Sequence, residues 1–319
     1  MTKAIALVSG GLDSILAANL IKNQGIDVIG LCFSSAFFTY ERAVKMCEQI
    51  DIPLKVIDFT DEHLSMVKSL KYEHGKSANF CIGCHGMMMK YSRRLMNELG
   101  ADFMVTGEVI SQRPMPKDVN DGRFEDYILR PLCAKNLPPT KMERDGLVDR
   151  EKLLDIKEGS RRVTMELAER WGIKEYPLSD GGCKLTEPGF SARLKDLLNY
   201  NKDINPDDVE MLNYGRHFRI NRDVKIISAR DEREGKVITP LIKKDDYIFN
   251  TIDFKGSTVI LRGNPSYDDI ILAAAIAGRY SKGRDEKEVR VKYKKQQDKE
   301  YNIIEVSPAR DEEITMYLL

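Results

Sequence analysis

The feature that most constrains this chain is a short apolar run that passes directly into a glycine-rich turn. Residues Ala4–Val8 predict a buried strand, the turn is Ser9-Gly10-Gly11-Leu12-Asp13-Ser14, and an apolar helical pattern follows over 15–21. Glycines let backbone N–H groups converge, and the N-terminal end of a helix dipole favours an anion there. The turn has neither the Gly-Lys-Ser/Thr of a Walker loop nor the Gly-x-Gly-x-x-Gly of a dinucleotide fold. A purely structural turn is the alternative, but the Asp13-Ser14 spacing favours a phosphate site.

The first half of the chain alternates apolar strands with amphipathic helices. Expected strands are Ala4–Val8, Asp27–Phe33, Leu54–Asp58 and Ala101–Val105, and expected helices are Ser14–Asn23, Thr39–Ile50 and Met87–Leu99. This alternation predicts a doubly wound parallel α/β sheet that binds ligands beyond the carboxyl ends of its strands. Phe33 ends the second strand, where it would either support an adenine ring or pack in the core.

The pattern changes in the last third of the chain. Short strands are expected at 225–227, 246–249, 257–261, 288–293 and 301–306, with one alanine-rich helix at Tyr267–Tyr280. Strands that do not alternate with helices favour an α+β arrangement. We therefore expect a larger α/β domain over 1–200, ending in a helix at Phe190–Leu198, and a small basic α+β domain over 201–319.

Charge is balanced over the whole chain but not locally. Lys and Arg together number 50, as do Asp and Glu, so the net charge does not indicate a nucleic-acid partner. Residues 211–310 nevertheless hold 21 Lys and Arg against 15 Asp and Glu, a net of +6. The basic residues gather near the two ends of this segment, as Arg216, Arg219, Arg222 and as Lys292, Lys294, Lys295, Lys299 around Tyr293. They favour contact with RNA phosphates and bases, or else a strand edge protected by lysine.

The six cysteines fall into two groups. Three lie in apolar surroundings and are expected in the core, namely Cys32, Cys47 and Cys133. Cys81 and Cys84 form a CxxC motif before a helix, and Cys183 follows two glycines. Such cysteines act as a redox pair, as zinc ligands completed by a residue such as His85, or as three ligands of an iron–sulfur cluster that leave one iron open.

Two further segments follow expected strands. Thr106-Gly107-Glu108 comes after the fourth strand, with Gln112 shortly beyond it. A turn in that place can reach the sugar or base of a nucleotide. Arg130, within Leu129-Arg130-Pro131-Leu132, offers a cation to an α-phosphate, and a surface salt bridge is its alternative role.

Together, the Ser-Gly-Gly-x-Asp-Ser turn, the Thr-Gly-Glu turn, the Leu-Arg-Pro-Leu segment and the stretch Cys84–Met89 resemble the catalytic domain of tRNA 4-thiouridine synthases, which are PP-loop ATPases. The resemblance covers residues 3–200. It implies an ATP site containing Ser9, Gly10, Gly11, Asp13, Ser14, Gly107 and Gln112. The CxxC with a distant third cysteine is similar to the 4Fe–4S arrangement of iron–sulfur-dependent tRNA thiolases, including 2-thiouridine enzymes.

This resemblance implies a tRNA sulfurtransferase that adenylates a uridine carbonyl, converts ATP to AMP and pyrophosphate, and then inserts sulfur. The favoured product is 4-thiouridine, with 2-thiouridine as the alternative. Asp13 is expected to help hold Mg²⁺, and a 4Fe–4S cluster, or less favourably zinc, is expected on Cys81, Cys84 and Cys183. The expected partners are tRNA and a sulfide or persulfide donor.

Two other functions remain open at this point. A PP-loop enzyme that acts on a small molecule would work without RNA, and an RNA-binding module with a degenerate nucleotide site would not convert ATP to AMP. No apolar run reaches the about 18 residues that a membrane span needs. The N-terminus enters a core strand without a signal-peptide pattern. We therefore expect a cytoplasmic protein with no membrane partner, with a homodimer among its possible assemblies.

Overall fold

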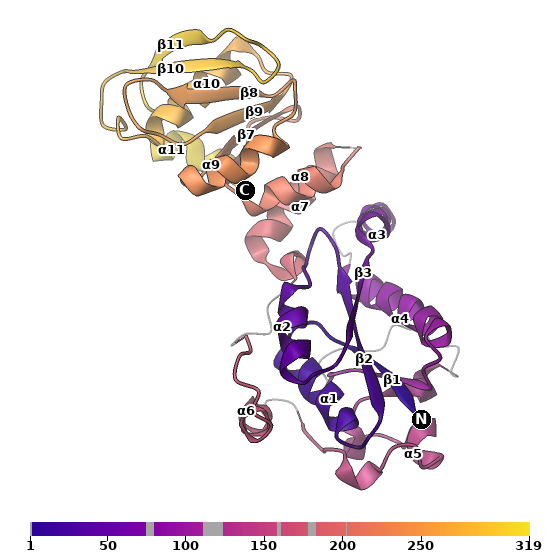
Figure 1. Ribbon diagram of the computed structural model, residues 1–319. Coiled ribbons are helices and arrows are strands. Elements are labelled where there is room, and N and C mark those ends of the chain that lie inside the picture. Colours follow the sequence, from indigo (N-terminus) through magenta and orange to yellow (C-terminus); the bar gives the residue numbers. More distant parts are fainter. Residues whose placement is uncertain (1, 75–79, 111–123, 158–160, 178–182, 202) are drawn as a thin grey trace. The chain divides into compact units, whose positions relative to one another are not determined.

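The computed structural model describes residues 2–74, 80–110, 124–157, 161–177, 183–201 and 203–319. The chain divides into two compact units, Met1–Cys183 and Lys184–Leu319. In Figure 1 the first unit is coloured from indigo to magenta, and the second ends in yellow. Across these residues, no helix has both the length and the apolar character that crossing a membrane requires.

A five-stranded sheet forms the centre of the first unit (Figure 1). Its strands are β1 (Lys3–Leu7), β2 (Asp27–Ser34), β3 (Leu54–Asp58), β4 (Phe103–Val105) and β5 (Ile128–Leu129), in the order β3-β2-β1-β4-β5. Every pairing is parallel. The strand order reverses between β1 and β4, so the loops that follow these two strands flank the crevice where such sheets bind ligands. The predicted doubly wound fold is thus confirmed.

Helices cover both faces of this sheet. They are α1 (Leu12–Lys22), α2 (Glu41–Gln49), α3 (Thr60–His74), α4 (Phe80–Glu98), α5 (Lys141–Arg144) and α6 (Arg161–Arg170). Successive residues of β1 belong to different cores, because side chains alternate across a strand. Ala4 and Ala6 lie in the core that contains α1 and α2, whereas Ile5 lies in the core that contains Met89 of α4.

The second unit is built on a six-stranded sheet in which every strand pairing is antiparallel. Its strands, in the order β11-β10-β8-β9-β7-β6, are β6 (Arg216–Arg219), β7 (Val224–Ser228), β8 (Tyr247–Thr251), β9 (Val259–Gly263), β10 (Val289–Lys295) and β11 (Asn302–Val306). Its helices are α7 (Pro188–Tyr200), α8 (Pro206–Glu210), α9 (Glu232–Ile238), α10 (Tyr267–Arg279) and α11 (Asp311–Ile314). The alanines Ala273, Ala274 and Ala277 of α10 pack into the core of this sheet.

The boundary between the two units falls after Cys183, earlier in the chain than residue 200, where it is expected from the sequence. Helix α7, which covers the expected helix Phe190–Leu198, lies in the second unit. Asp196 on this helix accepts hydrogen bonds from Arg219 of β6 at 2.8 Å and from Lys225 of β7 at 3.0 Å. Side-chain contacts therefore attach α7 to the second sheet.

Candidate functional site

The glycine-rich loop between β1 and α1 is held in place by close backbone packing. Gly10 has a φ of +81°, a conformation that side chains other than glycine rarely adopt. A Cβ atom at Gly10 would lie 2.6 Å from the Cβ of Arg42 and 2.9 Å from the backbone nitrogen of Ala43, at the start of α2. The loop thus packs closely against the first turn of α2. Gly10 is required there both by its positive φ and by the lack of space for a Cβ atom.

The same loop leads into a helix start that carries no side-chain cap. Gly11 is the N-cap of α1, and no side chain there accepts a hydrogen bond from the first turn. The Ser14 hydroxyl donates to the carbonyl oxygen of Gly11 at 2.8 Å, and the Gly11 N–H points at the Ser9 hydroxyl at 3.4 Å. Asp13 lies in the first helical turn. The backbone N–H groups of this turn are therefore suited to an anion.

The turn after β4 lies directly on this loop. A Cβ atom at Gly107 would come within 2.5 Å of both the Cα and the nitrogen of Ser14, and within 2.6 Å of the carbonyl carbon of Asp13. No side chain fits at Gly107, because all three of these atoms belong to the backbone and cannot move aside as a flexible side chain could. The structure thus brings together two predicted segments that are over ninety residues apart in the sequence.

Glu108, next to Gly107, pairs with two basic side chains from different elements. Its Oε1 lies 3.2 Å from Nε2 of His85 on α4, and its Oε2 lies 3.4 Å from a terminal nitrogen of Arg130 after β5. The three side chains are 15%, 8% and 16% exposed, in the order Glu108, His85, Arg130. Arg130 is therefore part of a largely buried ion pair and not a surface salt bridge.

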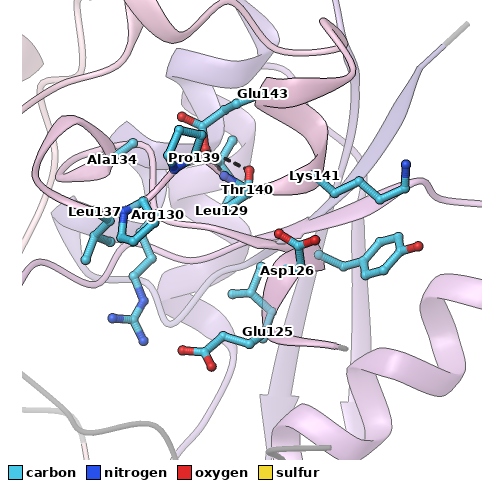
Figure 2. A pocket seen from close by; sticks show the side chains of 13 residues that line it. Glu125, Asp126, Leu129, Arg130, Ala134, Leu137, Pro139, Thr140, Lys141 and Glu143 are labelled. Carbon is cyan, nitrogen blue, oxygen red and sulfur yellow. Dashed lines mark hydrogen bonds between the residues drawn. The ribbon is translucent and has the colours of Figure 1, made fainter. Parts of the chain in front are cut away.

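Arg130 also lines a cavity of about 580 Å³ that runs along β5. Figure 2 shows its mixed lining, in which Glu125, Asp126 and Lys141 accompany Arg130 and the apolar side chains of Leu137 and Pro139. This volume falls within the range of about 300–1,000 Å³ that small-ligand pockets occupy. The glycine-rich loop and the cavity are thus connected through Arg130 and Glu108.

Phe33 is the next-to-last residue of β2, close to the predicted strand end, but it is buried, with 5% of the residue exposed. It packs 5.2 Å from the ring of Phe59 and 6.2 Å from that of Tyr91, measured between ring centroids. Of its two predicted roles, this environment favours core packing. Gln112, also predicted to contact a nucleotide, lies outside the described residues, as do Gly181 and Gly182.

The CxxC motif lies inside α4, whose first turn contains Cys81. Cys81 is exposed, Cys84 is buried and Cys183 is half-buried. Among the residues that the structure describes, no three His, Cys, Asp or Glu side chains are arranged to hold a metal ion. The predicted cluster of Cys81, Cys84 and Cys183, and the zinc alternative with His85, therefore do not fit the arrangement of these residues.

The remaining cysteines occupy the core positions that the sequence predicts. Cys32, Cys47 and Cys133 are buried and free. Burial raises the pKa of Cys32 and of Cys47 to about 12, and burial likewise raises that of Cys133. These thiols are protonated near neutral pH and are poor nucleophiles.

In the second unit, the first predicted basic cluster has a structural role. Asp196 accepts hydrogen bonds from two nitrogens of Arg219, both at 2.8 Å, while Arg216 lies 4.4 Å from the ring centroid of Tyr280. Burial lowers the pKa of Lys225 to about 8, against the pull of Asp196. Burial would raise the pKa of Asp196, but its bonds with Arg219 and Lys225 lower it. Of the predicted cluster, Arg222 is exposed.

In the second basic cluster the aromatic residue differs from the predicted one. Tyr293 packs against the core and stacks on Phe249, with ring centroids 5.3 Å apart and planes 12° from parallel. Lys292 and Lys294 instead lie over the ring of Tyr301. Strand periodicity would have revealed this, because Tyr293 falls on the same side as Val289 and Val291.

Two family models match separate parts of the chain. Residues 2–121 match the tRNA methyl transferase HUP domain, and residues 215–318 match the NFACT protein RNA binding domain. The first match contains the glycine-rich loop and the Thr-Gly-Glu turn, and the second covers all six strands of the antiparallel sheet.

Curated relatives match a little over half of this chain. The chain is 28% identical over 193 residues to the tRNA-specific 2-thiouridylase MnmA of Francisella tularensis subsp. holarctica, covering 54% of each protein. It is 28% identical over 221 residues to the tRNA-specific 2-thiouridylase MnmA of Bacillus licheniformis, covering 62% of this chain and 56% of the relative. The match thus spans about half the length of these relatives. Among solved structures, a 4-thiouridine synthetase–RNA complex with bound ATP matches at 18% identity and a TM-score of 0.38, covering 54% of this chain and 41% of the other.

Proposed function

We propose that this protein is an ATP-dependent tRNA uridine thiolase that forms 2-thiouridine. The observation that carries the proposal is the contact of Gly107 with the backbone of Asp13 and Ser14, which places the turn after β4 on the glycine-rich loop at the strand-order switch. A HUP-domain match over this region and an RNA-binding-domain match in the second unit agree with such an enzyme.

In the proposed first step, the uridine carbonyl oxygen attacks the α-phosphorus of ATP. The bond to pyrophosphate breaks, and an adenylated uridine forms. The N–H groups at the start of α1, after Ser9-Gly10-Gly11, would hold the pyrophosphate. Asp13, in the same turn, would supply a carboxylate oxygen to Mg²⁺, which prefers such ligands. Arg130, oriented by Glu108, would stabilise the charge that develops on the α-phosphate.

In the second step, sulfur replaces the activated oxygen. A sulfur nucleophile attacks the ring carbon, the carbon–oxygen bond breaks, and AMP leaves with the former carbonyl oxygen. Adenylation makes this possible, because AMP is a far better leaving group than hydroxide. Since the described cysteines do not form a cluster site, no part of this step is assigned to a cluster.

The sulfur would come from a persulfide on the exposed Cys81. Cys81 and Cys84 are three residues apart on α4, a spacing that places both on one side of a helix. The terminal persulfide sulfur attacks the uridine carbon, and the Cys84 thiolate then attacks Sγ of Cys81. The sulfur–sulfur bond breaks, thiouridine is released, and a Cys81–Cys84 disulfide remains for an external thiol to reduce.

The choice of 2-thiouridine rests on the curated relatives, which are named 2-thiouridylases. The chain shares 28% identity with them over about half of their length. This favours the 2-thiouridine alternative of the sequence analysis over 4-thiouridine.

The nucleotide products test the adenylation step. Purified protein with ATP, Mg²⁺ and unmodified tRNA should release AMP and pyrophosphate in equal amounts, and tRNA should stimulate the reaction. Release of ADP and phosphate would rule out adenylation. Undiminished AMP release with RNA omitted would favour a small-molecule substrate instead.

A further inference from the structure

Some side chains of the second sheet point away from its hydrophobic core. Val289, Val291 and Tyr293 of β10 belong to the core that contains α10. Because side chains alternate across a strand, Lys292 and Lys294 lie on the opposite face. Strands β10 and β11, at the edge of this sheet, appear in yellow tones in Figure 1.

Tyr301 extends the same face beyond β10. Lys292 pairs in register with Ile303 of β11, and Tyr301 precedes Ile303 by two residues, so their side chains share a side. The ammonium groups of Lys292 and Lys294 lie 5.1 Å and 5.0 Å from the centroid of the Tyr301 ring. Tyr301 is 48% exposed and Ile303 is 65% exposed. The Tyr301 face is defined here as Lys292, Lys294, Tyr301 and Ile303.

The two lysines of this face form no ion pair among the described residues, and Glu305, on the same side of β11, lies opposite Arg290 in the register. Arg290, the next basic residue on this side of β10, pairs with Asp253. Lys294 donates a hydrogen bond to the carbonyl oxygen of Asp298 at 2.6 Å, which leaves its charge in place. Within the described residues, no carboxylate forms a salt bridge with Lys292 or Lys294.

We infer that the Tyr301 face binds a single-stranded RNA segment, with one unstacked base against Tyr301 and Ile303 and the adjacent phosphates near Lys292 and Lys294. An aromatic ring flanked by lysines suits a base and its phosphates together, and it does not distinguish strongly between bases. A regular duplex keeps its bases stacked and hides them from such a ring. This inference rests on the proposed RNA-binding role of the second unit and adds the surface and the form of RNA.

The test compares RNA affinity among full-length variants without ATP. A fluorescein-labelled single-stranded RNA of twelve nucleotides and the blunt duplex of the same sequence are titrated, with fluorescence anisotropy as the readout. Tyr301→Ala should weaken single-strand binding by about tenfold, the effect typical of losing one stacked base. Tyr301→Phe, which keeps the ring, should bind within about twofold of wild type. Duplex binding should be weaker and insensitive to both changes.

The lysines are tested by salt dependence. Log affinity falls as log salt rises. Replacing both Lys292 and Lys294 by Gln should make this slope less steep by about 1.4, the value for two phosphate contacts with a single strand. Lys282→Gln is the control, since Lys282 is exposed, belongs to neither β10 nor β11, and donates its backbone N–H to the carbonyl oxygen of Lys255. Equal effects of Lys282→Gln and Lys292→Gln would indicate bulk charge and overturn the inference, as would wild-type affinity of Tyr301→Ala.

These outcomes are separable from failure of the proposed reaction. If the protein binds RNA through Tyr301 but releases no AMP, the inference stands and the enzymatic proposal fails. If AMP and thiouridine form normally in Tyr301→Ala with unchanged RNA affinity, the reaction stands and the inference fails.

Discussion

At the scale of single residues, a glycine and a glutamate determine how the candidate site is assembled. Gly107 allows the turn after β4 to touch the backbone of Ser14, and Glu108 beside it joins Arg130 to His85. The sequence predicts the glycine and the arginine but not the link between them. The pairing of Glu108 with Arg130 could have been suspected, because the two residues have opposite charge and each follows the end of a neighbouring strand.

Replacing Gly107 by Ala tests the contact between the two turns. The new Cβ would lie 2.5 Å from backbone atoms of Ser14, so the turn or the helix start must shift. We expect an unfolding free energy lower by about 1–3 kcal/mol, as for other overpacked sites. ATP affinity, measured by calorimetry, should fall at least about tenfold, or about 1.4 kcal/mol. Gly235→Ala, within α9 where nothing blocks a Cβ, should leave ATP affinity unchanged.

Glu108→Gln tests whether the ion pair orients Arg130 for catalysis. The amide keeps the shape but removes the charge that faces Arg130 and His85. We expect the rate of AMP formation to fall about tenfold, or about 1.4 kcal/mol, with ATP affinity within threefold of wild type. A loss confined to ATP affinity would contradict this role. Asp196→Asn, which disrupts a buried pair with Arg219 in the second unit, should leave the rate unchanged.

At the scale of elements, the sequence predicts most strands and the helix α10 well. It misses α3, however, and places the start of α4 at Met87 where the helix begins at Phe80. Strand β3 matches its expected bounds, and α10 ends one residue before its expected end. Strand β5 is two residues long, too short for any periodic signal, and β6 has two arginines among its four residues. The sequence places α7 with the first domain, whereas Arg219 and Lys225, the partners of its Asp196, follow it in the chain by more than twenty residues and lie on the second sheet.

Substitutions in α4 test the proposed persulfide route. Cys84→Ser should still convert ATP to AMP but should release no thiouridine, because Cys81 would stay joined to the base through a disulfide. Mass spectrometry should detect this protein–tRNA adduct, and dithiothreitol should release it. Cys81→Ser should form no adduct. Cys47→Ser is the control, since burial raises the pKa of the Cys47 thiol to about 12. Adduct-free thiolation by Cys84→Ser would contradict the route.

At the scale of the whole molecule, the chain joins a parallel α/β unit with a candidate nucleotide site to an antiparallel unit with an exposed basic face. The fold class of each unit was predictable. Strands and helices alternate along the first part of the sequence, and they no longer alternate in the last third. The cysteine cluster was not borne out by the described residues, because three cysteines in a sequence do not determine where their side chains meet. Spacing within one helix is predictable, but proximity between helix and loop depends on tertiary packing.

The stability of the first unit should depend on pH through His63. This side chain is fully buried, and burial lowers its pKa to about 4 from 6.5. Between these values the unfolded chain binds a proton that the folded chain does not, so stability falls as pH drops below 6.5. The loss at pH 5 should be about 2 kcal/mol. Trp171, the only tryptophan, packs against the first unit's core and reports its unfolding by urea. His63→Gln should remove most of this loss; an unchanged loss would contradict the assignment.

Nucleoside analysis of tRNA after reaction tests the central claim most directly. Full-length protein is incubated with unmodified tRNA, ATP, Mg²⁺ and a persulfide donor, and the digested tRNA is analysed by mass spectrometry against 2-thiouridine and 4-thiouridine standards. We predict 2-thiouridine that depends on ATP, with one AMP released per sulfur inserted. Sulfur-free tRNA alongside AMP release, or thiouridine formed without ATP, would contradict the account; 4-thiouridine in its place would keep the reaction and overturn the product.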